Sequence, residues 1–230
     1  MKHFSLRHKI LALTAIAAFS LHAQTHYESN FTIGAKGGAT LSMASFSPTL
    51  PQSMLKGIIL GATFRYVEER NFGVIAEVNL EQRGWQEDFE NAPYNYSRTL
   101  TYIQVPLLTH IYFGSTRFHG FFNAGPEFAY MIGESTSANF DVNNFADLPD
   151  FPKVNRSTEQ FAMPIKNKFD YGISVGAGAE YFLRRNHSIS IEGRFYFGLG
   201  NMFGASKSDV FAASRGMSLQ ISLGYNFRLK

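Results

Sequence analysis

The feature that most constrains this chain is a period-two alternation of apolar and polar side chains that recurs in eight segments. In each segment one face carries no charged residue, although 17% of the whole chain is charged. The opposite face is small and polar, with charges of both signs. This alternation is typical of β-strands with one apolar face, and no long amphipathic helix is evident. The segments cover 31–41, 57–66, 72–83, 102–113, 118–132, 168–182, 188–199 and 216–228.

The connections between these segments alternate strictly between long and short. The long ones cover 42–56, 84–101, 133–167 and 200–215, and the short ones 67–71, 114–117 and 183–187. A soluble sandwich would also alternate, with its apolar face inward. The loop pattern instead predicts an all-β fold, an eight-stranded antiparallel up-and-down transmembrane β-barrel with long outer loops and tight periplasmic turns. A closed barrel also pairs every backbone N–H and C=O within lipid.

The N-terminus predicts export across the inner membrane. Lys2, Arg7 and Lys9 precede an apolar stretch, and small residues follow as far as Ala23. This pattern predicts a signal peptide over residues 1–23 and a barrel domain over 24–230. The leader holds three bases and no acids, so its removal lowers the formal net charge from +3 to zero. We expect a location in the cell outer membrane and no nucleic-acid partner, because no basic stripe is present.

Aromatic residues gather at the strand ends next to the short turns. Such residues form girdles at the bilayer interface in outer-membrane barrels, so these positions predict contact with outer-membrane lipid. Phe227, close to the C-terminus, is also the expected recognition residue for the barrel assembly machinery. The predicted periplasmic girdle comprises Phe31, Phe64, Tyr66, Phe72, Phe113, Phe118, Tyr181 and Phe227.

The polar faces place acids and bases together inside the predicted barrel. An eight-stranded barrel has an interior just wide enough for side chains to fill, and an unpaired buried charge is costly. We therefore expect a salt-bridged plug in which Arg65, Arg83 and Arg194 are the natural partners of three acids, although the sequence does not fix which pairs with which. Those acids are Glu77, Glu127 and Glu192. The predicted lumen charge network comprises Lys36, Arg65, Glu77, Glu81, Arg83, Glu127, Lys168, Asp170, Glu180, Glu192, Arg194 and Arg228.

Catalytic chemistry has less support than this structural interpretation. Glu77 and Glu81 share one strand face and could act as an acid/base pair, but a salt-bridged plug is the better explanation for them. His110 and His119 could approach each other across a short turn, although no clear third metal ligand accompanies them. The chain also has no cysteine. We expect no catalytic residues, no metal and no cofactor.

Two of the predicted outer loops are rich in aromatic residues. Exposed aromatic residues on long loops indicate a contact surface for a partner. An equally good interpretation is that the loops fold over the barrel mouth. The loop contact candidates are Trp85, Tyr94 and Tyr96 in the stretch 84–101, and Phe140, Phe145 and Phe151 in the stretch 133–167.

Several short motifs follow one another along the chain. They include Gly34-Ala-Lys-Gly-Gly38, Tyr102-Ile-Gln-Val-Pro-Leu-Leu108 and Asn123-Ala-Gly-Pro-Glu127, followed by Phe169-Asp-Tyr-Gly172 and Glu192-Gly-Arg-Phe-Tyr196. In order and spacing, over residues 31–228, the chain resembles the PorT family of porin-like outer-membrane barrel proteins of Bacteroidetes. The resemblance implies an eight-stranded outer-membrane barrel, and the family's namesake is associated with type IX protein secretion.

The sequence leaves three functions open. The first is a non-enzymatic structural or interaction component linked to protein secretion, with secretion-system proteins as partners, as the resemblance implies. The second is a narrow porin-like channel for small solutes. The third is an outer-membrane enzyme that acts at the barrel rim.

Overall fold

The computed structural model describes residues 29–90, 92–145, 148–149, 151–152, 157–204 and 209–229. The predicted signal peptide, residues 1–23, lies outside the described residues. The elements are β1 (Asn30–Ser47), β2 (Gln52–Ser53), β3 (Leu55–Glu69), β4 (Phe72–Glu87), β5 (Tyr96–Gly114), β6 (Phe118–Ala138), the 3₁₀ turn η1 (Glu159–Phe161), β7 (Phe169–Arg184), β8 (His187–Gly198) and β9 (Ala213–Arg228).

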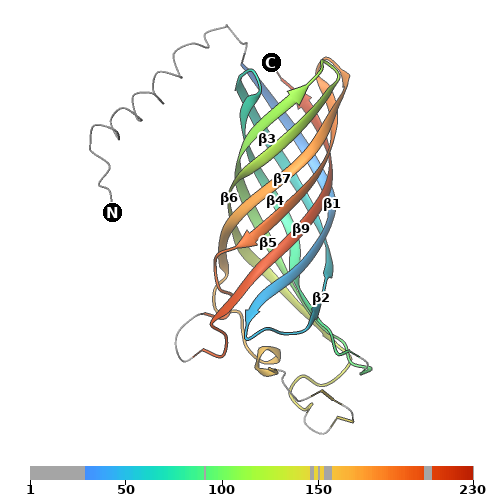
Figure 1. Cartoon of the computed structure of the whole chain (residues 1–230), viewed down its shortest axis with the longest axis vertical. Coiled ribbons are helices and arrows are strands. Elements are labelled where there is room, and N and C mark those ends of the chain that lie inside the picture. Colours follow the sequence, from blue (N-terminus) through green and yellow to red (C-terminus); the bar gives the residue numbers. More distant parts are fainter. Residues whose placement is uncertain are drawn as a thin grey trace, which may run out of the picture.

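The long strands close into an antiparallel barrel (Figure 1). Around the barrel the order is β4, β3, β1, β9, β8, β7, β6 and β5, and a further pairing of β4 with β5 completes the cylinder. The two-residue β2 pairs only with the outer end of β4, so it extends the wall without adding a strand to the cylinder. The predicted eight-stranded up-and-down barrel is therefore confirmed. Among the described residues, no helix is long and apolar enough to cross a membrane.

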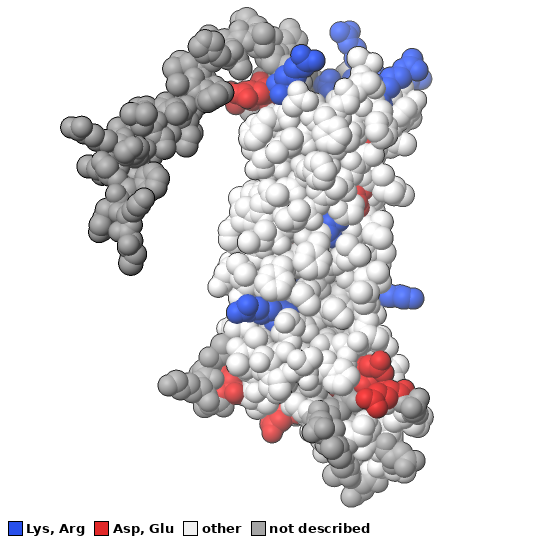
Figure 2. Space-filling view, viewed as in Figure 1, with Lys and Arg blue, Asp and Glu red and all other residues white. Residues whose placement is uncertain are grey.

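The two faces of the wall differ as the alternation requires. Apolar side chains such as Ile58, Val175 and Leu223 point outward and are about half exposed or more. Polar side chains such as Gln104 and Glu127 point inward and are fully buried. Figure 2 shows a largely uncharged wall between charged ends. This outward apolar face is the arrangement of a barrel in lipid rather than of a soluble sandwich.

The strands are longer at their outer ends than the alternation predicts. β4 runs on to Glu87 and pairs there with Tyr96 at the start of β5, and Tyr96 in turn pairs with Ala138 at the end of β6. The connection 84–101 is thus reduced to residues 88–95. The outward side chains of this extension include Thr99 and its partner Ser135 on β6. Because this part of the wall has no apolar outer face, the period-two pattern disappears while the ladder continues.

Two prolines interrupt the ladders on both sides of β5. Between β4 and β5 the pairing stops after Ala76–Leu107 and resumes at Asn79–Gln104, which leaves Pro106 without a partner on β4. Between β5 and β6 a similar gap spans the positions opposite Pro126. Proline lacks the N–H that a ladder needs, so a local break is its expected consequence.

Candidate functional site

Arg194 on β8 is the centre of one half of the lumen network. Its guanidinium donates two parallel hydrogen bonds to Glu77 on β4, from Nη1 to Oε2 at 2.7 Å and from Nη2 to Oε1 at 2.9 Å. The same group contacts Glu192 on its own strand at 2.8 Å, and Lys36 on β1 donates to Glu77 at 2.6 Å. The planar fork of arginine suits such bidentate contact with a carboxylate. Side chains from three strands therefore meet across the lumen.

Arg83 on β4 is the centre of the other half. Its Nη1 donates to Glu81 at 3.1 Å and to Glu127 at 3.3 Å, and its Nη2 donates to Asp170 at 2.8 Å. The guanidinium also lies between two aromatic rings, 4.2 Å from the Tyr102 centroid and 4.3 Å from the Tyr196 centroid. Carboxylates in the plane and rings on both faces leave no open direction around this cation.

Arg65 and Glu180 form a third pair nearer the periplasmic end. Two parallel hydrogen bonds of 2.8 Å join the guanidinium on β3 to the carboxylate on β7, and Ser188 on β8 donates to the same carboxylate at 2.5 Å. Uncharged side chains donate further hydrogen bonds to Glu127 and Glu81. Ser174 donates to Glu127 at 2.6 Å, and Ser218 donates to Glu81 at 2.8 Å.

Two of the predicted network residues lie elsewhere. Lys168 is exposed and precedes the first residue of β7, so its side chain is not in the lumen. The predicted segment 168–182 begins one residue before β7, so the prediction that Lys168 faces the lumen was wrong. Arg228 is half-buried at the periplasmic mouth, with its guanidinium 5.6 Å from the Phe182 ring centroid and no ion pair to a described residue. The remaining predicted members line the lumen.

The predicted partners are only partly those that the structure brings together. Arg83 contacts Glu127, and Arg194 contacts both Glu77 and Glu192. Arg65 instead pairs with Glu180, on a strand far from it in the sequence. Sequence position alone gives no distance across a lumen, so it could not decide between these acids.

Little space remains between these side chains. The cavity beside Arg65, Glu77 and His110 has a volume of about 30 Å³, and that beside Arg83 and Tyr102 has about 10 Å³. A water molecule occupies about 30 Å³ of liquid. The described lumen is therefore filled by its own side chains.

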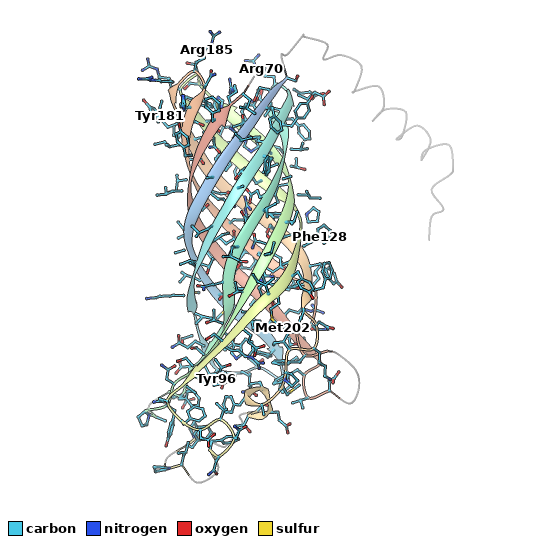
Figure 3. The ribbon with its side chains drawn as sticks, turned by 180° about the vertical axis from the view of Figure 1, so that it is seen from behind. Arg70, Tyr96, Phe128, Tyr181, Arg185 and Met202 are labelled. Atoms are coloured by element: carbon cyan, nitrogen blue, oxygen red, sulfur yellow. The ribbon has the colours of Figure 1, made fainter. Side chains whose placement is uncertain are left out.

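An aromatic cap covers the outer mouth of the barrel (Figure 3, near the labelled Tyr96 and Met202). Trp85 is fully buried, with its ring 5.3 Å from Phe46 and 5.9 Å from Phe203. Tyr96 is also fully buried and packs 4.6 Å from Phe161 of η1. Loops that are far apart in the sequence thus share one small hydrophobic core above the lumen.

This cap corrects the prediction of an exposed aromatic contact surface. Trp85, Tyr96 and Phe151 are buried, whereas Tyr94 and Phe140 are partly buried against the same core. Phe145 is also partly buried and lies 5.4 Å from Phe151 and 5.5 Å from Phe161. Each aromatic side chain removes a large apolar area from water when it packs against its neighbours, which stabilises the packed arrangement over an exposed one. The alternative interpretation, loops folded over the mouth, describes the structure.

Arg98 ties the cap to the wall, and the sequence prediction did not include it. Its Nε donates to Glu134 on β6 at 2.7 Å, and its Nη1 donates to the backbone oxygens of Gln160 at 3.1 Å and Met163 at 2.7 Å. Gln160 in turn donates to Glu87 at 2.7 Å. The even-numbered positions of β5 face the lumen, so extending that phase back from Gln104 would have found Arg98, and Tyr102 with it.

The predicted periplasmic girdle lies on the lipid-facing surface next to the short turns. Phe31, Phe64, Tyr66, Phe72, Phe113, Phe118 and Tyr181 are exposed there. Phe227 is half-buried, and its ring lies 4.9 Å from that of His187 on β8.

The two histidines do not form a metal centre with their neighbours. The Nδ1 atom of His110 lies 2.7 Å from the amide oxygen of Asn123, and its ring stacks on Tyr112 at 5.4 Å. His119 stacks on the other side of Tyr112, at 5.0 Å. Among the described residues, no group of three or more His, Asp or Glu side chains is placed to hold a metal ion.

A family model described as "Outer membrane protein beta-barrel domain" matches residues 22–204, which is most of the chain. The chain belongs to this family. Membership agrees with the closed barrel and its apolar outer wall, and it places this outer membrane protein beta-barrel domain in the outer membrane. No curated protein sequence matches the chain.

The chain is also similar to solved structures of other outer-membrane proteins. OprG of Pseudomonas aeruginosa is 13% identical with a TM-score of 0.49, and the match covers 86% of this chain and 96% of that one. Outer membrane protein W of E. coli is 18% identical with a TM-score of 0.40, covering 88% and 100%. The outer membrane enzyme PagL is 11% identical with a TM-score of 0.41, covering 85% and 98%.

Proposed function

We propose that this outer-membrane barrel is a non-enzymatic structural or interaction component with a closed lumen, linked to protein secretion. The observation that carries the proposal is the side-chain plug around Arg83 and Arg194, because a filled lumen leaves the two ends of the barrel as the surfaces available for function. The aromatic cap supports it, since it adds a second closure above the plug.

The link to secretion rests on the ordered motifs that resemble the PorT family. Glu127 and Arg194, which lie within two of those motifs, both belong to the plug. A motif residue that fills a lumen has a structural role, so these positions favour a barrel used as a scaffold over a barrel used as a catalyst.

The narrow-channel alternative is tested by conductance. The purified full chain in planar bilayers should give no steady conductance steps in neutral potassium chloride. A stable ohmic conductance in the unmodified protein would contradict the closed lumen and favour the channel. The variant R83M/R194M is the useful comparison, because it removes the cations at both centres of the plug.

The secretion role is tested in cells that produce this protein. Deletion of its gene should lower the export of secreted cargo proteins, and the wild-type gene should restore export. A variant tagged in an outer loop should recover other secretion components from detergent-extracted outer membranes. Normal export after deletion would contradict the secretion role but would leave the closed barrel standing.

A further inference from the structure

The periplasmic mouth holds a second concentration of charge, separate from the lumen network. An open hollow of about 950 Å³ lies there, and the described residues that line it include several arginines and no Asp or Glu. Figure 2 shows basic side chains clustered at this end, and Figure 3 labels Arg70, Tyr181 and Arg185 around it. We call this surface the arginine basin. Its arginines are Arg70, Arg117, Arg184, Arg185 and Arg228.

These arginines have no acidic partners among the described residues. Arg83, Arg65 and Arg194 in the lumen each form an ion pair, whereas none of the basin arginines does. The Nε atom of Arg228 is buried and has no hydrogen-bond partner within the described structure. Glu68 and Glu69 precede Arg70, but neither lines the hollow or forms an ion pair with these arginines, so the guanidinium groups around the hollow repel one another. An anionic ligand would remove that repulsion.

The basin arginines stand on the short periplasmic turns or at the strand ends beside them. Arg70 and Arg185 each begin a two-residue turn and are each followed by an asparagine. Backbone hydrogen bonds tie the turns to neighbouring strands, from Tyr112 N to Asn71 O at 3.1 Å and from Arg228 N to Asn186 O at 2.8 Å. Asn71 adopts a positive φ of 77°, which asparagine tolerates in tight turns. Turns that are already ordered lose less backbone entropy when a ligand binds than flexible turns would.

The floor of the basin indicates the direction from which a ligand arrives. Tyr112, His119 and Phe182 occupy lumen-facing positions at the mouth and line the hollow. Lipid surrounds the barrel wall, where Tyr181 and Leu183 face outward, but it does not lie beneath the mouth on the barrel axis. A ligand that reaches the floor therefore comes from the periplasm. The mixture of rings and guanidinium groups suits a peptide, whose carboxylates and apolar groups both find partners.

We propose that the arginine basin docks an acidic segment of a periplasmic protein, with Asp or Glu carboxylates held by guanidinium groups from several turns. This inference rests on the proposed function, for which it names the class of partner. The hollow of the arginine basin has a volume in the range of sites that hold drug-sized ligands, so an acidic segment of a few residues would fit it.

The test uses the full chain in phosphatidylcholine nanodiscs and a fluorescent hexaglutamate peptide as the probe. We expect saturable binding to the wild-type protein, and binding at least tenfold weaker to R70Q/R117Q/R184Q/R185Q. Raising the salt concentration should weaken wild-type binding, because these are exposed charges. The variant K56Q/K166Q is the matched control: it removes cations from the outer half and should bind as the wild type does. Equal binding by the wild type and the arginine variant would overturn the proposal.

Competition separates this ligand from other anions. At constant ionic strength, millimolar inorganic phosphate should leave hexaglutamate bound, and replacing phosphatidylcholine by phosphatidylglycerol should change its affinity less than twofold. Displacement by phosphate would show a phosphate site, and loss of binding in phosphatidylglycerol would show a lipid headgroup site. Either result would overturn the proposal.

Two further measurements distinguish failure of the arginine-basin proposal from failure of the closed-barrel function. Folding of each variant is checked by its heat-dependent mobility in gel electrophoresis, and conductance is recorded on the same samples. A conducting barrel that binds hexaglutamate contradicts only the closed lumen. A closed, folded wild-type barrel that does not bind the peptide contradicts only the arginine basin.

Discussion

Glu77 on β4 and Arg194 on β8 join opposite sides of the barrel, between strands that share no backbone hydrogen bond. Each strand of the cylinder is paired with its two neighbours, so the ladders set the mean diameter of the barrel, but the distance between two given opposite strands can still change if the cross-section flattens. This ion pair, with its two parallel hydrogen bonds, fixes that distance. The plug thus contributes to the shape of the barrel as well as to its closure.

The first prediction concerns this pair. E77Q leaves Arg194 and Lys36 without a full counter-charge, so it should lower the free energy of unfolding by about 3–5 kcal/mol. Equilibrium unfolding in denaturant, with the protein in lipid vesicles, measures this value. E69Q changes an exposed acid at the end of β3 and should have little effect. In a double-mutant cycle with R194Q the losses should not be additive; additive losses would contradict the coupling.

The second prediction concerns the surroundings of Arg83. R83K keeps the charge, but a lysine cannot reach Glu81, Glu127 and Asp170 together, nor lie flat between two rings. We expect a loss of unfolding free energy of about 2 kcal/mol or more, on the scale of a desolvated cation–π contact. R185K, on an exposed turn, is the control and should unfold like the wild type. Unchanged stability of R83K would show that the charge alone matters.

The third prediction concerns the lipid-facing wall. Leu107 points outward from the middle of β5 and is 46% exposed. L107R should lower the free energy of unfolding in vesicles by about 2–4 kcal/mol, because an arginine at the bilayer midplane is costly. L183R places the same side chain next to the periplasmic turn and should cost about 0–1 kcal/mol. Equal effects of the two substitutions would mean that these positions lie at the same depth.

The fourth prediction separates the cap from the plug. W85A removes a fully buried ring from the cap core and should loosen the outer loops, at a local cost of about 3–5 kcal/mol. Cleavage by an external protease between residues 139 and 168 should become faster than in the wild type. Conductance should stay absent, because the Arg83 and Arg194 clusters below are intact. Conductance in W85A would instead make the cap the principal closure.

The sequence predicts well those parts of the molecule that the bilayer constrains. Within the membrane, outward positions such as Val175 must be apolar, so the alternation reveals strand, face and phase together. Above the membrane that constraint ends, and the extensions of β4 and β5 carry polar side chains such as Gln86 and Thr99 outward. Because the alternation ends there, it does not show that Trp85 and Tyr96 continue the lumen-facing positions of β4 and β5 into the core of the cap.

The pairing inside the lumen lay beyond sequence reasoning for a different reason. Which acid meets Arg65 depends on shear and on the distance between opposite walls, and neither is encoded in the spacing along one strand. Lys168 shows the related error, because it has the correct phase but lies just outside its strand. The arginine basin was missed because its members are scattered over separate short turns and become neighbours only when the cylinder closes.

The cross-lumen pairs also constrain how such a protein can enter a membrane. A partial sheet of β1 to β4 would carry Glu77 and Glu81 with Lys36 and Arg83 as their counter-charges, before β8 and β9 had delivered Arg194 and Ser218. Strand-by-strand insertion would therefore place charged groups with incomplete sets of hydrogen bonds, and an open sheet edge, in hydrocarbon. We expect biogenesis to gather nearly all of the hairpins at a sheltered site and to release them into the bilayer as an almost finished cylinder.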